Sequence, residues 1–219
     1  MARVLIEVPT YDGRISPATS ESLWRLDRAG HDVDYHPRPG YGCAMARNRM
    51  AADALDAGYD WLLMVDNDIE LPRDALANLM EHGTDFVMGW YLNRYARGGR
   101  RKACLFKLGA IGWQMYEADE LQALSDAGTH LIEVAAGGLG CALVRTDVFR
   151  RMEFPWFEWK DQSRLPRLAA DVHSLPGDAF NSGGEDVNFC LRLATVGVTC
   201  YADTRVACGH EFREVVWPS

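Results

Sequence analysis

The feature that most constrains this 219-residue sequence is a continuous apolar run, Trp61–Val65, followed at once by the acidic triplet Asp66-Asn67-Asp68. A strand that is apolar at every position must be buried on both faces, which is typical of a parallel sheet covered by helices on both sides. The two carboxylates then stand at the carboxyl end of the strand, where open α/β sheets bind their ligands. The run therefore predicts both a fold class and the place of a site.

Segments typical of strands and helices alternate around this run. Residues 4–8 predict a strand that stops at the turn-forming residues after Pro9. Ser16-Pro17 predicts the start of a helix that reaches about Gly30. We expect next a strand at 32–36, a helix at 46–57, a helix opened by Pro72 and a strand at 86–91. This alternation predicts a parallel, doubly wound sheet with right-handed crossovers.

The pattern changes after residue 91. We expect residues 111–116 to pair back on the basic stretch 94–107 as a hairpin, before a helix near 117–126. Residues 154–184 are rich in aromatic residues, proline and polar residues, which is typical of a long functional loop. The other expected elements are a strand at 142–145, a short helix capped by Thr146, a helix at 185–195 ended by Gly197, and extended segments at 199–202 and 205–208.

Composition limits the partners and the compartment. The net charge of −8 argues against a protein whose whole surface binds nucleic acid, although a local basic patch remains compatible with it. The six cysteines lack the CxxC spacing of a zinc site, so we expect free thiols in a reducing cytoplasm. The first residues are too few and too charged for a signal peptide, and no run approaches the roughly 20 apolar residues of a membrane span. We therefore expect a cytoplasmic protein with no membrane span.

The triplet carries the strongest chemical signal. If the segment stays extended, Asp66 and Asp68 point the same way, and their carboxylates repel each other unless a cation lies between or beside them. A hard divalent ion, completed by water and phosphate oxygens, is the natural partner. The alternative is a turn, in which Asp and Asn are common. The position directly after a buried strand favours the metal site.

Other residues permit more than one interpretation each. Glu185 and Asp186 follow two glycines, and one of them can accept a proton from a hydroxyl, yet acids also stabilise a helix N-terminus. His210 is either a metal ligand or a structural residue. Arg47 holds a phosphate, anchors a carboxylate, or faces solvent. A basic cluster is either solvated or meets an anionic ligand: Arg94, Arg97, Arg100, Arg101 and Lys102. Three aromatic residues stack on a ligand or fill the core: Trp156, Phe157 and Trp159.

Seven segments occur in a distinctive order along the chain: Val8-Pro9-Thr10-Tyr11, Ala46-Arg47-Asn48, residues 64–72, 138–145, 154–157 and 184–190, and Cys208-Gly209-His210. Taken in order, these segments resemble one family, the GT-A glycosyltransferases, especially family-2-like bacterial and phage members. The resemblance covers nearly the whole chain and implies a Rossmann-like α/β sandwich with a mostly parallel central sheet. It also implies a single domain over 1–219, with a nucleotide-binding half at 1–91 and an acceptor-binding half at 92–219.

The resemblance further implies roles for individual residues. Asp186 matches the catalytic base of inverting members, and Glu185 beside it touches the acceptor. Asp68 matches the direct metal ligand, Asp66 the acid that faces the ribose and the metal shell, and His210 a third group of the metal site. The residues that match the nucleotide-binding segment are Pro9, Thr10, Tyr11 and Arg47.

The implied reaction moves a sugar from a nucleoside-diphosphate sugar to an acceptor hydroxyl, with Mn²⁺ or Mg²⁺ and with inversion, although retention stays open. Residues 157–183 match no family pattern, so the resemblance leaves the class of acceptor open between a glycan, a small molecule and a modified nucleic-acid base. One alternative is a sugar-phosphate nucleotidyltransferase. Such enzymes usually have a glycine-rich loop with a lysine soon after the first strand, whereas residues 9–16 of this chain contain no lysine. Another alternative is a GT-A-like module that binds a glycan or nucleotide without turnover.

Overall fold

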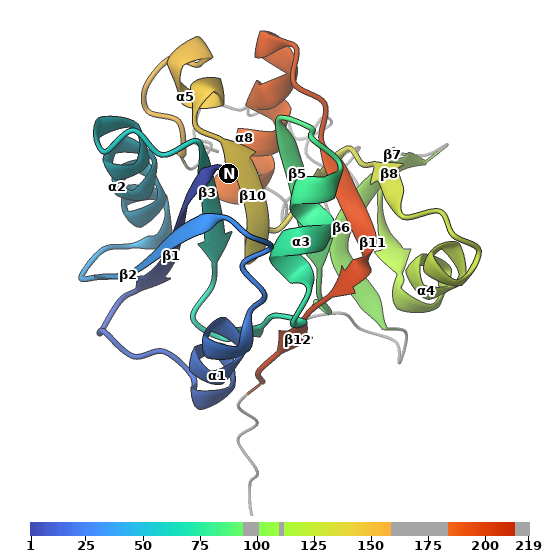
Figure 1. The fold of residues 1–219 in the computed structure, drawn as a ribbon. Coiled ribbons are helices and arrows are strands. Elements are labelled where there is room, and N and C mark those ends of the chain that lie inside the picture. The colour runs from blue at the N-terminus through green and yellow to red at the C-terminus, as the bar shows by residue number, and fades with distance from the viewer. Residues whose placement is uncertain (94–100, 110–111, 159–183, 213–219) are drawn as a thin grey trace, which may run out of the picture.

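A computed structural model describes residues 1–93, 101–109, 112–158 and 184–212, and its main element is a seven-stranded sheet (Figure 1). In spatial order its strands are β2 (Asp32–Pro39), β1 (Arg3–Thr10), β3 (Trp61–Val65), β10 (Cys141–Arg145), β5 (Phe86–Trp90), β11 (Tyr201–Ala207) and β8 (Leu131–Glu133). β1 pairs in parallel with β2 and β3, and β5 pairs in parallel with β11, whereas β10 and β8 run antiparallel to their neighbours. The sheet is mostly parallel, as predicted.

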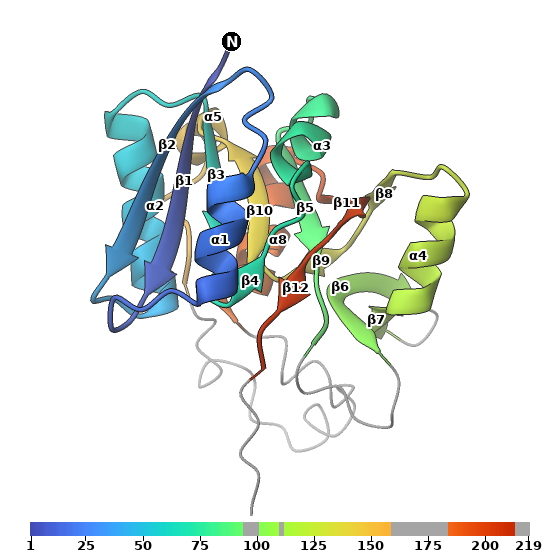
Figure 2. The same ribbon diagram turned by 60° about the horizontal axis from the view of Figure 1, so that its bottom comes forward.

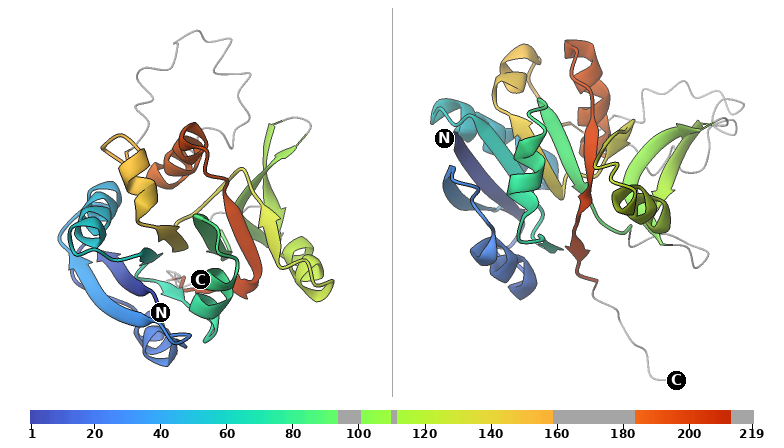
Figure 3. Two further views of the ribbon diagram at one scale, coloured as in Figure 1. Left: turned by 45° about the horizontal axis from the view of Figure 1, so that its top comes forward. Right: turned by 45° about the vertical axis from the view of Figure 1, so that its right-hand side comes forward.

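Helices cover both faces of this sheet (Figure 3). One face packs against α1 (Pro17–Arg25) and α3 (Ala75–Glu81), and the other against α2 (Cys43–Asp56), α5 (Asp147–Arg151) and α8 (Glu185–Leu193). Most of these helices turn apolar residues inward, such as Met50 and Ala54 in α2 or Leu76 and Leu79 in α3, at the spacing of an amphipathic helix. The fully buried residues of α1 are instead polar, Thr19 and Ser22. Because both faces are covered, β3 and β5 are buried along their whole length.

Two smaller sheets extend the fold. β6 (Lys102–Gly109) pairs antiparallel with β7 (Gly112–Glu117), as expected, and with β9 (Ala136–Gly137), next to α4 (Ala118–Asp126). β4 (Ile69–Glu70) pairs antiparallel with β12 (Gly209–His210), and Figure 2 shows this pair beside α1. The second pairing brings the end of the described chain back to the acidic triplet.

Several predicted boundaries are wrong. α1 ends at Arg25 rather than near Gly30, because Leu26 is extended with ψ 129°. α2 begins at Cys43 rather than at 46, with Gly42 as its N-cap. Pro72 does not open α3; its carbonyl accepts the N–H of Ala75 in the turn before the helix. In each case a local hydrogen bond or backbone angle sets the end of the element, which the apolar pattern does not report.

The C-terminal part shows the same kind of difference. Thr146 does not cap α5 with its side chain; its hydroxyl donates to the carbonyl of Tyr59 instead, at 2.5 Å. α8 ends at Leu193 and passes into the 3-10 turn Ala194–Val196, which Gly197 closes in the left-handed conformation (φ 72°), as predicted. The two expected extended segments form one strand, β11, with an irregular register.

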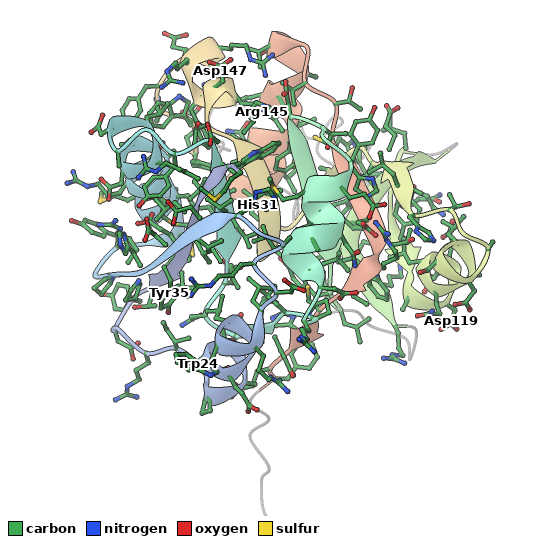
Figure 4. All side chains as sticks on the ribbon, in the orientation of Figure 1. Trp24, His31, Tyr35, Asp119, Arg145 and Asp147 are labelled. Carbon is green, nitrogen blue, oxygen red and sulfur yellow. The ribbon has the colours of Figure 1, made fainter. Side chains whose placement is uncertain are left out.

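The end of the sheet opposite the triplet is closed by structural ion pairs. Arg145, the last residue of β10, and Asp147, the first residue of α5, lie there (Figure 4). The Arg145 guanidinium covers the ring of Trp61 at 4.3 Å and pairs with Asp85 at 3.2 Å. These contacts leave the other end of β3 as the place for chemistry.

All six cysteines are free thiols, as predicted. None of the helices in the described ranges has the length and apolar character that crossing a bilayer requires.

Candidate functional site

The acidic triplet forms a turn at the end of β3. The N–H of Asp66 donates to the carbonyl of Gly140 at 3.0 Å, and the N–H of Ile69 donates to the carbonyl of Asp66 at 3.1 Å. The extended geometry is therefore wrong, because the turn sends the two carboxylates to different partners. Asp66 pairs with Arg47, and Asp68 lies beside His210.

Arg47 in α2 joins two parts of the site. Its side chain is buried, with 3% of the residue exposed. Nη2 donates to Asp66 Oδ1 at 2.7 Å and Nη1 donates to Glu185 Oε1, so the guanidinium connects the end of β3 with the start of α8. Burial alone would lower the pKa of Arg47, but the charges of Asp66, Glu185 and Asp186 outweigh it and raise that pKa. Arg47 is thus a carboxylate anchor, and the interpretation that it faces solvent is wrong.

Glu185 and Asp186 share the first turn of α8 but have different surroundings. Burial raises the pKa of Glu185, against the opposing charge of its partner Arg47. Burial also raises the pKa of Asp186, whose Oδ1 accepts the N–H of Val187 at 2.8 Å. Among the described residues, no cation forms an ion pair with Asp186. One carboxylate is therefore fixed by an arginine, while the other is suited to accept a proton.

His210 is held with its Nε2 atom toward the triplet. Nδ1 lies 2.7 Å from the carbonyl oxygen of Leu92, which only accepts, so Nδ1 carries the proton. Nε2 lies 3.6 Å from Asp68 Oδ2. The pairing of β12 with β4 and the bond from the Glu211 N–H to the Asp68 carbonyl, at 2.9 Å, fix this approach. A histidine whose second nitrogen donates to a carbonyl is typical of a metal ligand.

The donor set suits a cation that is held together with a ligand. Asp68 and His210 supply one carboxylate and one imidazole side by side. In the ranges that the structure describes, no three His, Cys, Asp or Glu side chains gather into a complete metal site. Mg²⁺ and similar ions commonly take one or two protein ligands and complete their shell with water and phosphate oxygens. The residues present fit that pattern.

An open pocket of about 310 Å³ lies beside Asp68. Asn67, the middle residue of the triplet, organises its wall: its side chain donates to the carbonyl of Arg14 at 3.0 Å, and its own carbonyl accepts the N–H of Ser16 at 2.9 Å. The loop after β1 is thereby fastened to the triplet. The lining residues are Asp12, Arg14, Ile15, Ser16, Asn67, Asp68 and Glu211.

The residues expected to meet a nucleotide stand at the same end of the sheet. Pro9 and Thr10 are the last residues of β1 and are buried, while Tyr11 is 81% exposed. Thr10 Oγ1 is buried without a hydrogen-bond partner in the described part of the chain. Because β1 and β3 are parallel neighbours, this end of β1 lies on the side of Asp66. Contact of these residues with a nucleotide stays a prediction.

Two features escaped the sequence reasoning. Glu7 is fully buried in β1, where Arg38 of β2 pairs with both Glu7 and Asp53 of α2. Burial raises the pKa of Glu7, and Arg38 opposes this. In the sequence, the available signal for this buried ion pair was Glu7 itself, a single acid inside an otherwise apolar strand. The second feature is Tyr91, a buried phenol among the site residues, for which the sequence offers no comparable signal.

Two aromatic residues at the start of the expected long loop, Trp156 and Phe157, pack against or within the core. Phe157 is 1% exposed and stacks on Phe189 of α8 with ring centroids 4.4 Å apart, so of its two interpretations the core position is confirmed. Trp156 donates its indole N–H to the carbonyl of Phe149 at 2.8 Å. Several expected acceptor-side residues lie outside the described residues: Arg94, Arg97, Arg100, Trp159 and most of the loop 154–184.

Comparison with known proteins shows the fold. No family model and no curated protein matches the sequence. A197 from STIV has a TM-score of 0.60 at 19% identity, with 96% of this chain and 86% of that chain covered. GalNAc-T7, solved with UDP, GalNAc and Mn²⁺, has a TM-score of 0.58 at 12% identity, and this chain spans 44% of its length while 97% of this chain is covered. The chain has the α/β GT-A glycosyltransferase fold, as predicted; membership of the family-2-like group stays a prediction.

Proposed function

We propose that this chain is a glycosyltransferase that moves a sugar from a nucleoside-diphosphate sugar to an acceptor hydroxyl, with Mn²⁺ or Mg²⁺. One observation carries the proposal: buried Arg47 ties Asp66 at the end of β3 to Glu185 at the start of α8. In the proposal, the acid that faces the donor is thereby connected to the acid that contacts the acceptor, and Glu185 directly precedes the proposed base, Asp186. The GT-A fold supports this, and one protein similar in fold was solved with UDP, GalNAc and Mn²⁺.

The donor side consists of the triplet and the end of β1. In the proposal, Asp68 and His210 hold the ion together with the diphosphate, while Asp66, fixed by Arg47, faces the ribose and the metal shell. A bound divalent ion supplies charge neutralisation for the leaving diphosphate. The nucleotide lies against Pro9, Thr10 and Tyr11. This assigns residues 1–91 to the nucleotide and residues 92–219, apart from the metal ligand His210, to the acceptor, within a single domain.

The acceptor side is the start of α8. Asp186 takes the proton of the acceptor hydroxyl while the acceptor oxygen bonds to the anomeric carbon and the bond to the diphosphate breaks, which inverts that carbon. The raised pKa of Asp186, caused by burial, suits a base that must accept a proton and pass it on. Glu185, held by Arg47, contacts the acceptor: a glycan, a small molecule or a modified nucleic-acid base. The six free thiols are consistent with a cytoplasmic location.

The experiment is an assay of nucleoside-diphosphate release from a panel of nucleotide sugars, with Mn²⁺ and with a chelator. Water replaces the unidentified acceptor, so the assay needs no acceptor. The wild type should release one diphosphate in a Mn²⁺-dependent manner, and Asp186→Asn should lose roughly 10²–10⁴-fold in rate. Asp147→Asn, an exposed acid at the opposite end of the sheet, is the control and should keep the wild-type rate. Full activity of Asp186→Asn would remove this residue as the base.

A further inference from the structure

Tyr91 contacts both Gly140, which is hydrogen-bonded to Asp66, and the ring of His210, although none of the roles above uses it. It directly follows β5 and is 6% exposed. Its hydroxyl oxygen accepts the N–H of Gly140 at 3.1 Å, and the carbonyl of Gly140 accepts the N–H of Asp66 at 3.0 Å. Two hydrogen bonds through one glycine therefore connect the phenol to the backbone of the acid that Arg47 holds.

The Tyr91 phenol explains why positions 138 and 140 are occupied by glycine. A Cβ atom on Gly138 would lie 2.2 Å from the Tyr91 hydroxyl oxygen, and one on Gly140 would lie 2.9 Å from it. Both distances are shorter than real Cβ contacts. Glycine permits the backbone to approach a group this closely because it has no side chain. The segment Gly138-Leu139-Gly140, the start of the matching segment 138–145, thus makes room for one hydroxyl.

The other side of the same residue faces His210. The two rings meet edge to face, with centroids 5.1 Å apart and an interplanar angle of 83°. The next residue, Leu92, holds His210 Nδ1 through its carbonyl at 2.7 Å. The short segment Tyr91-Leu92 therefore contacts the imidazole in two ways, through a ring and through a backbone oxygen.

We propose that Tyr91 is a positioning residue that sets the backbone of Asp66 and the imidazole of His210 relative to each other. The inference rests on the proposed function, since it concerns the donor and metal side of that site. The hydroxyl fixes the triplet through Gly140, and the ring fixes the histidine, so one side chain determines where a cation and a diphosphate can be held. The phenol keeps its proton at neutral pH, because burial and the nearby charges of Asp66 and Asp186 raise its pKa well above the ordinary value.

The test compares Tyr91→Phe with Tyr59→Phe. Phenylalanine keeps the ring against His210 and removes only the hydroxyl. Tyr59 is a matched control, because it is also buried and its hydroxyl donates to Asp34 at 2.6 Å, outside the site. The readout is Mn²⁺ affinity, measured by electron paramagnetic resonance with UDP, GDP or dTDP present, together with the free energy of unfolding.

Tyr91→Phe should weaken Mn²⁺ binding by roughly tenfold or more, the usual effect of losing a group that orients a metal ligand. Tyr59→Phe should lose stability but keep the wild-type Mn²⁺ affinity. Equal Mn²⁺ affinity in the wild type and in Tyr91→Phe overturns the inference and leaves the proposed function intact. A wild type that binds no Mn²⁺ with any diphosphate overturns the proposed function, and the inference fails with it.

A second variant reaches the same hydroxyl from the opposite side. Gly138→Ala should displace the phenol, lower stability and weaken Mn²⁺ binding. In the Tyr91→Phe background the same change should cost much less, because the atom at 2.2 Å is gone, so the two losses should not add. If the losses of stability and of Mn²⁺ affinity add, the close packing of the Tyr91 hydroxyl against Gly138 is contradicted. If Tyr91→Phe does not fold, Gly138→Ala decides alone, and wild-type Mn²⁺ affinity in that variant overturns the inference.

Discussion

Replacing Arg47 by methionine removes the guanidinium that pairs with both Asp66 and Glu185 while keeping a long side chain in α2. Glu185, 5% exposed, then stays buried without its partner, and Asp66 loses its ion pair. Removing one partner of a buried ion pair costs about 3–5 kcal/mol, because a charge is left uncompensated. We expect urea denaturation to show a free energy of unfolding lower by that amount, with an unchanged m-value.

The loss should depend on pH. In the wild type burial raises the pKa of Glu185 and of Asp186, and the charge of Arg47 opposes this, so both pKa values should rise further in the variant. A carboxyl whose folded pKa exceeds its unfolded pKa costs nothing below the unfolded pKa, and its cost grows until the pH passes the folded pKa. The variant should therefore be closest to the wild type near about pH 4 and furthest from it at about pH 8.

Two further variants serve as controls for the stability loss of Arg47→Met. Arg49→Met removes an arginine of the same helix whose side chain is 61% exposed and whose ion pair with Asp53 is worth only about 0.3–0.5 kcal/mol. Adding Glu185→Gln to Arg47→Met should recover part of the loss, since the stranded buried charge is removed as well. A loss below about 1 kcal/mol for Arg47→Met, or a loss that does not change with pH, would refute the role of Arg47 as the link between β3 and α8.

Three further predictions test other parts of the account. Asp186→Asn should lower turnover by roughly 10²–10⁴-fold with donor affinity kept. Because the substitution removes a buried carboxyl of raised pKa, the unfolding free energy of the variant at about pH 8 should equal or exceed that of the wild type. A clear loss of unfolding free energy would contradict the raised pKa of Asp186. His210→Ala should raise the Mn²⁺ concentration needed for half-maximal nucleotide binding, and a structure with Mn²⁺ and nucleotide in which His210 lies far from the ion would exclude it as a ligand. For Asp203, burial would raise the pKa, but hydrogen bonds from Arg205 and His82 outweigh it and lower the pKa. This group therefore stabilises the fold above its unfolded pKa, and the advantage of the wild type over Asp203→Asn should shrink as the pH falls below about 4; a constant difference down to about pH 2 would contradict the assignment.

The fold could be predicted where a local pattern reports burial. Trp61–Val65 is apolar at each position, and the structure buries it between helices on both faces of the sheet, with β1 parallel on one side and β10 antiparallel on the other. The place of the acids at the end of this strand follows from the same pattern. The direction of β10 could not be predicted in this way, because a short apolar strand such as Cys141–Arg145 reads alike in parallel and antiparallel pairing.

The site depends on partners that the sequence separates widely. Arg47 and Glu185 are 138 residues apart, and no local pattern predicts that one guanidinium joins them. The turn at the triplet overrides the extended geometry, because the carbonyls of Gly140 and Asp66 accept bonds that fold it. Tyr91 and Gly140 are likewise 49 residues apart in the sequence, although they lie beside the neighbouring strands β5 and β10. Such contacts come from tertiary packing, whereas apolar periodicity reports only which face of an element is buried.

The central claim is that a nucleoside diphosphate binds here together with a divalent ion held by Asp68. Calorimetric titration of UDP, GDP and dTDP into the wild type and into Asp68→Ala, with Mn²⁺ and with a chelator, tests it most directly. One diphosphate should bind the wild type only when Mn²⁺ is present, and Asp68→Ala should lose this binding while its melting temperature stays close to that of the wild type. Undiminished Mn²⁺-dependent binding by Asp68→Ala, or no binding of any diphosphate by the wild type, would contradict the claim.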